Sequence, residues 1–296
     1  MKSFGRVLTA MITPFHEDLT VDYEGAANLA RYLVANGSDG LVVAGSTGEA
    51  ATLTEEERLH LFSTVLDAVG DQAAVIGGTG NNNTASTVQF SRKAAKLGLH
   101  GVLVAAPYYN KPTQKGIYQH IAAVADAVDT PIVVYNIPGR TGVNILPETA
   151  LKLAALPNVK AIKESSGNLE QIAAIIRQKP DDVAVYSGDD ALTLPILSIG
   201  GQGIVSVASH IVGNEIKAMV DAYQAGRVTE ARDMHLKLLP IFKVLFITTN
   251  PIPVKSAVSL LGLSTDKLRL PLTTAEADEV AKIRQAMLEA GLTIKG

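Results

Sequence analysis

The chain has 296 residues, a formal net charge of −3, and neither cysteine nor tryptophan; 47% of its residues are hydrophobic and 19% are charged. This much apolar material can bury a large core, which excludes a mainly disordered chain. The near-neutral charge gives no reason to expect a nucleic-acid or anionic-membrane partner. The lack of cysteine excludes disulfides, zinc–thiolate sites, iron–sulfur clusters and cysteine nucleophiles, and it fits a reducing cytosol.

No stretch of the sequence approaches the roughly 18 apolar residues that a membrane span needs. Lys2 and Arg6 precede an apolar stretch, as they would in a signal peptide. That stretch runs only from Val7 to Ile12 and stops at Thr13-Pro14, which is too short for such a peptide. We therefore expect a cytoplasmic protein that does not enter the membrane.

Short β-branched runs alternate with longer amphipathic stretches. The expected strands are Val7–Ile12, Gly40–Ala44, Ala74–Gly77, Gly101–Ala105, Ile132–Tyr135, Val159–Lys163, Val183–Ser187 and Gly203–Val207. The expected helices between them include Tyr23–Asn36, Glu55–Val69, Thr84–Leu97, Tyr118–Ala127 and Leu169–Gln178. Thr54 supports one helix start, because it offers a capping hydroxyl directly before three glutamates that the helix dipole favours.

Strands that are each followed by a helix predict a parallel sheet, and eight strands are the number that closes a (β/α)₈ barrel. The strands are apolar almost throughout, as parallel strands covered on both faces should be. We therefore predict an α/β protein with a (β/α)₈ TIM barrel over residues 1–226 and a C-terminal helical extension over 227–296. The extension should contain the helices Val228–Ile247, Pro253–Leu261 and Ala275–Ala290.

An open, doubly wound sheet is the alternative fold. It would normally carry a glycine-rich dinucleotide turn after its first strand, and this chain has Thr13-Pro14-Phe15 there.

Polar residues gather just after the expected strands. They are Gly45-Ser46-Thr47-Gly48-Glu49, Pro107-Tyr108-Tyr109-Asn110, Tyr135 to Arg140, Lys163-Glu164-Ser165-Ser166 and Gly188-Asp189-Asp190. In a (β/α)₈ barrel the carboxyl ends of all strands meet on one face, which carries the active site. The sequence therefore predicts a functional site on that face.

Lys163 is the most informative of these residues. It shares a strand face with Val159 and Ala161, while Ile162 points the other way. If that face is the barrel interior, burial lowers the pKa of the lysine, and a partly neutral lysine can form a Schiff base with a ketone. The alternative is a structural lysine paired with Glu164 or another rim carboxylate, and strand parity alone favours neither.

Three further positions suit the same site, each with an ordinary structural alternative. Tyr135 should reach the barrel mouth and relay protons, or else be a core tyrosine. Ser46 and Thr47 lie between two glycines, so their N–H groups and hydroxyls suit a carboxylate, or they form a plain turn. Arg140 suits a second carboxylate through a bidentate contact, or it is simply solvated.

Metal chemistry finds little support. The six histidines form no pair with ligand spacing. Asp189-Asp190 is the only candidate pair of carboxylates, and two adjacent carboxylates are weak evidence for a site. A metal-dependent barrel hydrolase therefore lacks ligands.

Taken together, six motifs make the chain resemble the dihydrodipicolinate synthase / N-acetylneuraminate lyase family of pyruvate-dependent class I aldolases, from Gly5 to about Pro271. The motifs are Gly45-Ser46-Thr47-Gly48-Glu49, Pro107-Tyr108-Tyr109, Tyr135-Asn136-Ile137-Pro138, Ile162-Lys163-Glu164, Ser187-Gly188-Asp189-Asp190 and Asn250-Pro251-Ile252-Pro253-Val254-Lys255.

Within this family the chain is more similar to the synthases than to the lyases. The arginine that matches Arg140 binds the carboxylate of the aldehyde substrate in the synthases, and the lyases carry an apolar residue there. Synthases usually have two threonines where this chain has Ser46-Thr47, a pair that is common in the lyases. Serine keeps the hydroxyl, so we expect the same chemistry.

The resemblance implies roles for individual residues. Lys163 forms the Schiff base with pyruvate, and Tyr135 transfers protons through Ser46 to Tyr109, which the neighbouring subunit supplies. Substrate-binding positions implied in the same way are Thr47, Val205, Gly188 and Arg140. Thr47 and the backbone near Val205 hold the pyruvate carboxylate.

The reaction implied is the aldol condensation of pyruvate with L-aspartate 4-semialdehyde, the first committed step of the diaminopimelate route to lysine. It needs no metal or organic cofactor, and the family forms homotetramers built from tight dimers. Two alternatives stay open: another aldolase of the family, acting on N-acetylneuraminate or a sugar acid, and an inactive barrel with a binding role.

The resemblance also bears on feedback by lysine. Tyr108 and Asn82 match the lysine pocket of feedback-sensitive members. The second expected helix, however, carries Glu55 and Arg58, and Ser86 replaces the glutamate that pairs with the ligand's amine. We expect inhibition by lysine to be weak or absent.

Overall fold

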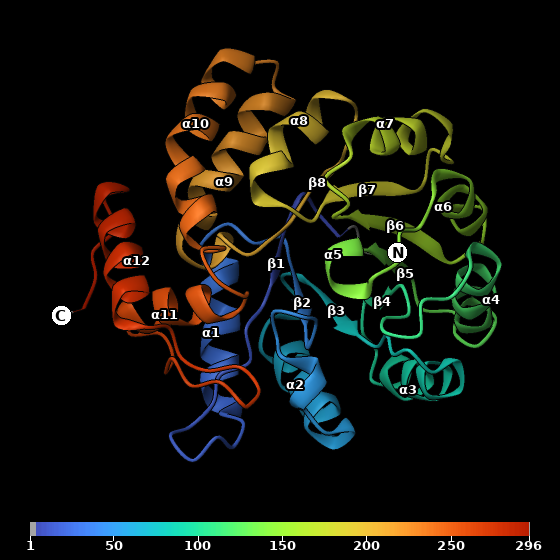
Figure 1. Cartoon of the computed structure of the whole chain (residues 1–296), viewed down its shortest axis with the longest axis horizontal. Coiled ribbons are helices and arrows are strands. Elements are labelled where there is room, and N and C mark those ends of the chain that lie inside the picture. The colour runs from blue at the N-terminus through green and yellow to red at the C-terminus, as the bar shows by residue number, and fades with distance from the viewer. Residues whose placement is uncertain (1–3, 296) are drawn as a thin grey trace.

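A computed structural model describes residues 4–295. In it eight parallel strands close into a barrel, each paired with the next along the chain, and β8 pairs with β1 (Figure 1). The strands are β1 (Val7–Ala10), β2 (Gly40–Val43), β3 (Ala74–Gly78), β4 (Gly101–Ala105), β5 (Ile132–Asn136), β6 (Val159–Glu164), β7 (Ala184–Ser187) and β8 (Gly203–Ser206). The predicted TIM barrel is confirmed.

Helices surround the barrel and cover its outer face (Figure 1). They are α1 (Tyr23–Ala35), α2 (Glu55–Val69), α3 (Thr84–Lys96), α4 (Gln114–Ala125), α5 (Pro138–Thr141), α6 (Pro147–Ala154), α7 (Leu169–Gln178), α8 (Thr193–Ser198), α9 (Ser209–Gln224), α10 (Val228–Val244), α11 (Ile252–Leu260) and α12 (Ala277–Glu289). Two short 3₁₀ turns, η1 (Ala50–Thr52) and η2 (Asp190–Leu192), follow β2 and β7.

Local hydrogen bonds set several element ends. Thr54 and Glu57 form the capping box that starts α2, as the sequence predicts. Helix α4 begins at Gln114, earlier than the predicted Tyr118, because the Thr113 hydroxyl accepts from the N–H of Gly116 and caps the extra turn. Strand β1 ends before Ile12, whose N–H donates to a histidine side chain instead of a strand carbonyl.

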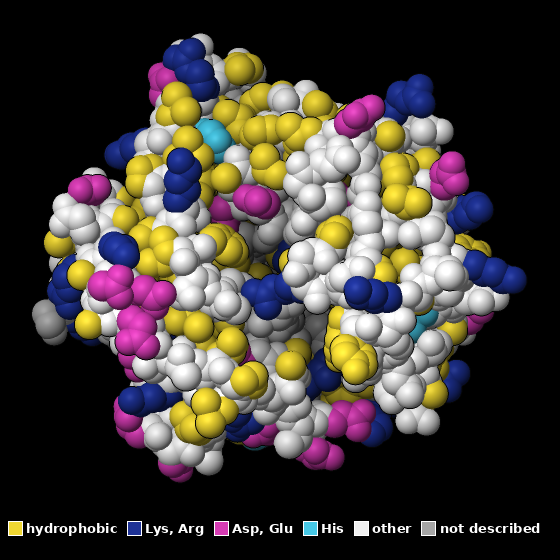
Figure 2. Space-filling model, in the orientation of Figure 1, with side chains coloured by type: hydrophobic (Ala, Val, Ile, Leu, Met, Phe, Trp, Pro, Cys, Tyr) yellow, Lys and Arg dark blue, Asp and Glu magenta, His cyan; other side chains and the backbone are white. Residues whose placement is uncertain are grey.

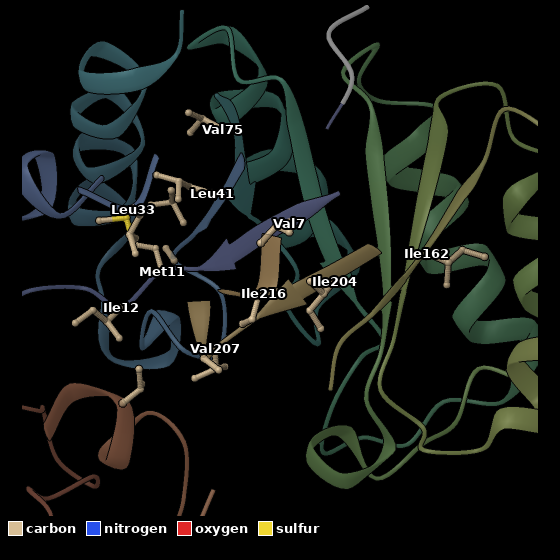
Figure 3. Packing of buried hydrophobic residues seen from close by; sticks show 14 of the residues in the cluster. Val7, Met11, Ile12, Leu33, Leu41, Val75, Ile162, Ile204, Val207 and Ile216 are labelled. Atoms are coloured by element: carbon tan, nitrogen blue, oxygen red, sulfur yellow. The ribbon is translucent and has the colours of Figure 1, made fainter. Parts of the chain in front are cut away.

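Two apolar clusters hold the fold together. One fills the barrel interior and includes Leu8, Val42, Leu103 and Ala161. The other lies between the strands and the surrounding helices, and Figure 3 shows part of it. Because parallel barrel strands are covered on both sides, successive side chains are buried on opposite faces.

The predicted direction of one side chain in β6, that of Val159, is wrong. Ala161 points into the barrel with Lys163 as predicted, but Val159 belongs to the outer cluster. The pairing of β5 with β6 shifts register here: Ile132 pairs with Val159, and Val133 already pairs with Ala161. Such a bulge adds one residue, Lys160, and reverses the side-chain parity before it.

The helices after the barrel lie together on one side of it (Figure 1). Helix α10 packs on α9 and α12, and α11 packs on the same two helices. The proposed domain boundary at residues 226/227 falls in the turn between α9 and α10 and stays a prediction. No helix within residues 4–295 is long and apolar enough to span a bilayer.

Candidate active site

A small cavity of about 60 Å³ opens where the carboxyl ends of the strands meet. Figure 2 shows a hollow near the middle of this face with Lys or Arg side chains at its edge. The cavity is lined by Ala10, Val42, Gly45, Ser46, Thr47, Leu103, Tyr135, Ile137, Arg140, Lys163, Gly188, Val207, Phe246 and Asn250. Sites for drug-sized ligands measure hundreds of Å³, so this one suits a small molecule.

Lys163 enters the cavity from the end of β6 and is 6% exposed. Burial lowers the pKa of its amine to about 7, because a charged ammonium loses its hydration there. The positive charge of Arg140 lowers the pKa further, and the negative charge of Asp190 opposes both effects. The Nζ atom lies 4.3 Å from the centre of the Tyr135 ring. A large share of this amine is therefore neutral near pH 7.

The structure decides against an ion pair with Glu164. Its carboxylate accepts hydrogen bonds from Asn136 Nδ2 at 3.1 Å, the Ser166 N–H at 2.8 Å and Gln171 Nε2 at 3.2 Å. Within residues 4–295 no carboxylate lies at ion-pair distance from Lys163. The alternative of a structural, paired lysine is therefore not what the structure shows.

Gly188 leaves the space that Lys163 occupies. A Cβ atom at position 188 would lie 2.8 Å from Lys163 Cε and 2.0 Å from Ser165 Oγ. Both distances are closer than van der Waals contact, so a side chain there would displace the lysine. Gly188 thus lines the cavity with backbone only.

Tyr135 lies beside Lys163, since the two residues pair across β5 and β6. Burial raises the pKa of its phenol to about 12, although the nearby Ser165 hydroxyl and the charge of Arg140 oppose this effect. The phenol is therefore protonated at neutral pH. In this position it can donate a proton or a hydrogen bond to a group held at Lys163.

The loop after β2 brings Ser46 and Thr47 to the cavity. Ser46 is exposed and Thr47 is 4% exposed. Within residues 4–295 the N–H groups of these two residues donate to no other residue. Adjacent N–H groups without a protein partner, together with two hydroxyls, are suited to bind a carboxylate.

Asn250 joins two of the predicted site residues. Its side-chain Nδ2 donates to Thr47 Oγ1 at 2.9 Å, and its backbone carbonyl accepts from Arg140 Nη2 at 2.7 Å. Arg140 is exposed, lies on α5 and keeps its other guanidinium nitrogens available at the cavity. A guanidinium anchored at one nitrogen is suited to bind a carboxylate with the others.

Asp190 is buried beside the cavity and holds the end of β8. It accepts hydrogen bonds from the Ser206 hydroxyl and from the N–H groups of Val207 and Ala208. These N–H groups therefore do not pair with a neighbouring strand, and β8 ends at Ser206 instead of the predicted Val207. Residues 4–295 contain no group of three or more histidine, aspartate or glutamate side chains able to hold a metal.

The structure brings together six of the eight predicted site residues: Ser46, Thr47, Tyr135, Arg140, Lys163 and Gly188. Val205 belongs to the cluster in the barrel interior and is absent from the cavity lining, which includes Val207 two residues later. The predicted contact of the backbone near Val205 with the pyruvate carboxylate stays a prediction. Tyr109 is 87% exposed on this chain and also lies outside the lining. Its predicted role across a subunit contact stays a prediction.

Sequence reasoning missed Asn250 and Phe246 as site residues. Both come from the segment between α10 and α11, far from the barrel strands in the sequence. In the sequence Asn250 stands out only as the start of a family motif. A polar asparagine directly before a proline, in the break between two predicted helices, is the signal that could have placed it in the site.

Comparisons with known proteins agree with this geometry. The model of the dihydrodipicolinate synthetase family matches residues 3–290. The 4-hydroxy-tetrahydrodipicolinate synthase of Heliobacterium modesticaldum is 56% identical, over 98% of this chain and 96% of that protein. The one from Moorella thermoacetica is 54% identical, over 98% of this chain and 99% of its own length.

Solved structures give the same result. The crystal structure of the dihydrodipicolinate synthase (DHDPS) from Cyanidioschyzon merolae, with lysine bound, superposes with a TM-score of 0.96 at 50% identity and covers 98% of this chain and 99% of that one. The dihydrodipicolinate synthase of Thermotoga maritima gives a TM-score of 0.96 at 42% identity, over 98% of this chain and 100% of that one. This chain belongs to the dihydrodipicolinate synthetase family.

Proposed function

We propose that the protein condenses pyruvate with L-aspartate 4-semialdehyde to give 4-hydroxy-tetrahydrodipicolinate, the first committed step of the diaminopimelate route to lysine. The observation that carries the proposal is Lys163, a buried amine with a pKa of about 7 that lines a small cavity and has no carboxylate partner within residues 4–295. The names of the relatives support the same reaction.

The amine of Lys163 attacks the ketone carbon of pyruvate, a C–N bond forms, and water leaves to give an iminium ion. This cation withdraws electrons from the pyruvate methyl group, which loses a proton to become an enamine. The enamine carbon attacks the aldehyde carbon of the second substrate, and the new alkoxide takes a proton. Ring closure by the substrate's amino group then releases Lys163.

Tyr135 is placed for the proton transfers in this sequence. Its protonated phenol, next to Lys163, donates when the water leaves and when the alkoxide forms. Ser46 lines the same cavity and, in this proposal, returns a proton to Tyr135 after each donation. That proton comes from solvent through Tyr109 of a neighbouring subunit.

The carboxylates of both substrates must be bound so that the enamine carbon lies close to the aldehyde carbon. The N–H groups and hydroxyls of Ser46 and Thr47 suit the carboxylate of pyruvate, which sits over Lys163. Arg140, at the outer edge, suits the carboxylate of the aldehyde. Placing the two reactants in this order turns a bimolecular encounter into a reaction within one site.

We also propose that the protein is a cytoplasmic homotetramer built from tight dimers, in which Tyr109 crosses a subunit contact. The residue has a φ of +71° and projects from the loop after β4, 87% exposed. Mixing a Tyr109→Phe protein with a Lys163→Ala protein, each weakly active, should restore activity through hybrid sites. If subunits are shown to exchange and no activity returns, Tyr109 does not act across the subunit contact.

The direct test is borohydride reduction in the presence of pyruvate, followed by peptide mass spectrometry. The expected result is one adduct, on Lys163. The second arm supplies the pyruvate-loaded enzyme with L-aspartate 4-semialdehyde, N-acetylmannosamine or a sugar-acid aldehyde and measures condensation. Turnover only with a sugar would assign the chain to another aldolase activity, and no adduct with pyruvate would overturn the mechanism.

A further inference from the structure

The loop that carries Ser46 and Thr47 ends at a buried glutamate. Glu49 is 4% exposed and has a φ of +56°, a left-handed backbone conformation that side chains other than glycine rarely adopt. Nothing in the proposed reaction uses this carboxylate. Its surroundings must therefore explain why a charge is buried two residues from Thr47.

The partner of Glu49 is a second buried charge from the C-terminal extension. Lys255, on α11, is 0% exposed, and its Nζ lies 2.5 Å from Glu49 Oε1. The same Nζ donates to the carbonyl of Lys267 at 2.6 Å and lies 4.1 Å from the centre of the Phe15 ring. The other carboxylate oxygen, Oε2, accepts from the N–H of Arg269 at 3.1 Å.

These contacts fix the β2 loop to the extension at two places. The first is the ion pair between Glu49 and Lys255, and the second is the hydrogen bond from Asn250 to Thr47. Asn250 lies two residues before the start of α11 and Lys255 lies inside that helix, so one short segment supplies both contacts. Thr47 is itself one of the two fixed residues, and Ser46 is the residue directly before it.

A buried ion pair is weak evidence for stability, because both charges lose their hydration. The two partners must nevertheless stay together, because moving one of them leaves the other as an unpaired charge in the protein interior, which costs free energy. A pair of this kind therefore suits the task of holding a loop in one position. Here the ion pair would hold the loop at Glu49, where the backbone has a positive φ.

We propose that the Glu49–Lys255 pair positions Thr47 and the adjacent N–H groups for the carboxylate of pyruvate, so that pyruvate binding depends on the C-terminal extension. Neither residue touches substrate; both act through the loop. The inference rests on the proposed function, since it assumes that pyruvate is held at this loop.

The experiment compares Lys255→Met and Glu49→Gln with wild type in the full-length protein. Borohydride trapping is measured over a range of pyruvate concentrations, with steady-state kinetics for both substrates and thermal unfolding. The pyruvate concentration that gives half-maximal trapping should rise about tenfold, which corresponds to about 1.4 kcal/mol of binding. Saturating pyruvate should still label Lys163, and the KM of the aldehyde should change much less than that of pyruvate.

Glu57→Gln is the matched control. Glu57 pairs with Arg269 of the same extension, with Arg269 Nη2 2.6 Å from Glu57 Oε1, but it lies on α2 and not on the β2 loop. A glutamine there can still accept the N–H of Thr54 and keep the capping box. This variant should lower the thermal midpoint and leave the half-maximal pyruvate concentration unchanged.

If Lys255→Met and Glu49→Gln lower the thermal midpoint like the control and leave pyruvate trapping unchanged, the pair only stabilises the fold and the proposal is wrong. Should Lys255→Met not fold, Glu49→Gln decides, because it keeps the size of the side chain and leaves a neutral partner for Lys255. Failure of the proposed function is distinct: wild type itself would then give no pyruvate adduct.

Discussion

Two lysines are buried within residues 4–295, one at the mouth of the barrel and one in the C-terminal extension. Lys163 lines a cavity and lies near an aromatic ring. Asp190, the carboxylate whose charge raises the pKa of Lys163, is already engaged with Ser206 and two backbone N–H groups. Lys255 meets an aromatic ring too, but it is in direct contact with Glu49.

Burial lowers the pKa of both amines, to about 7 for Lys163 and about 8 for Lys255. The shifts are similar, so a lowered pKa does not by itself identify a nucleophile. What separates the two lysines is access and pairing. Lys163 has a cavity above it and no ion-pair partner within residues 4–295, whereas Lys255 has its donors occupied by Glu49 and Lys267.

The most direct way to break this comparison is to remove the reactive amine. Lys163→Ala should abolish borohydride trapping and lower condensation on the order of a thousandfold or more, because no other lysine of residues 4–295 lines the cavity. Circular dichroism should show an intact fold. In the same assay Lys255→Met should still be labelled at Lys163 when pyruvate is saturating. Labelling of the wild-type protein at Lys255 would show that Lys255, and not Lys163, is the reactive amine.

Arg140→Ala tests the charge that faces Lys163 across the cavity. Losing a bidentate contact to the aldehyde carboxylate should cost roughly 2–5 kcal/mol in kcat/KM for the aldehyde. Formation of the pyruvate imine, measured by borohydride trapping in the absence of aldehyde, should change far less. Equal damage to both steps would show that Arg140 binds pyruvate instead.

The pH dependence of imine formation sharpens the comparison further. Only the neutral amine attacks, so the rate of trapping should rise with pH through about 7 and then level off. Asp190 raises the pKa of Lys163 and Arg140 lowers it. Asp190→Asn should therefore move the midpoint to lower pH and Arg140→Ala to higher pH, each by less than about one unit. Shifts in the same direction would contradict the assigned charges.

The smallest effect expected is inhibition by the free amino acid lysine. Its ammonium group would need a carboxylate partner in the protein, just as the side chain of Lys255 does. Glu55, the acidic candidate, is already paired with Lys93 at 2.9 Å. Arg58 lies 4.0 Å from the centre of the Phe90 ring and donates to the Gly78 carbonyl. An unpaired desolvated ammonium costs several kcal/mol, so initial rates at low pyruvate should barely respond to lysine.

The synthase of Cyanidioschyzon merolae, which was crystallised with lysine bound, provides the comparison protein for that titration. Strong, saturable inhibition of this chain at sub-millimolar lysine would show that Ser86 and the Glu55–Lys93 pair do not weaken the pocket.

Periodicity made the barrel predictable, because strand and helix patterns depend on neighbouring residues. The inward direction of Lys163 followed from its parity with Ala161. The same rule failed at Val159, since a bulge depends on the partner strand and leaves no mark in the local sequence. Asn250 was missed for a related reason: its place in the site depends on how α10 and α11 fold back over the barrel.

Asn250 and Lys255 lie far after the barrel strands in the sequence, and this order has a consequence for synthesis of the chain. All eight strands have been made once residue 206 is added, yet Phe246, Asn250 and Lys255 are still to come. At about 5–20 residues per second, the ribosome needs several more seconds to make them. During that interval a nascent chain can close its barrel around Lys163 without a finished site, so activity begins only after Phe246, Asn250 and Lys255 have been made and can pack on the barrel.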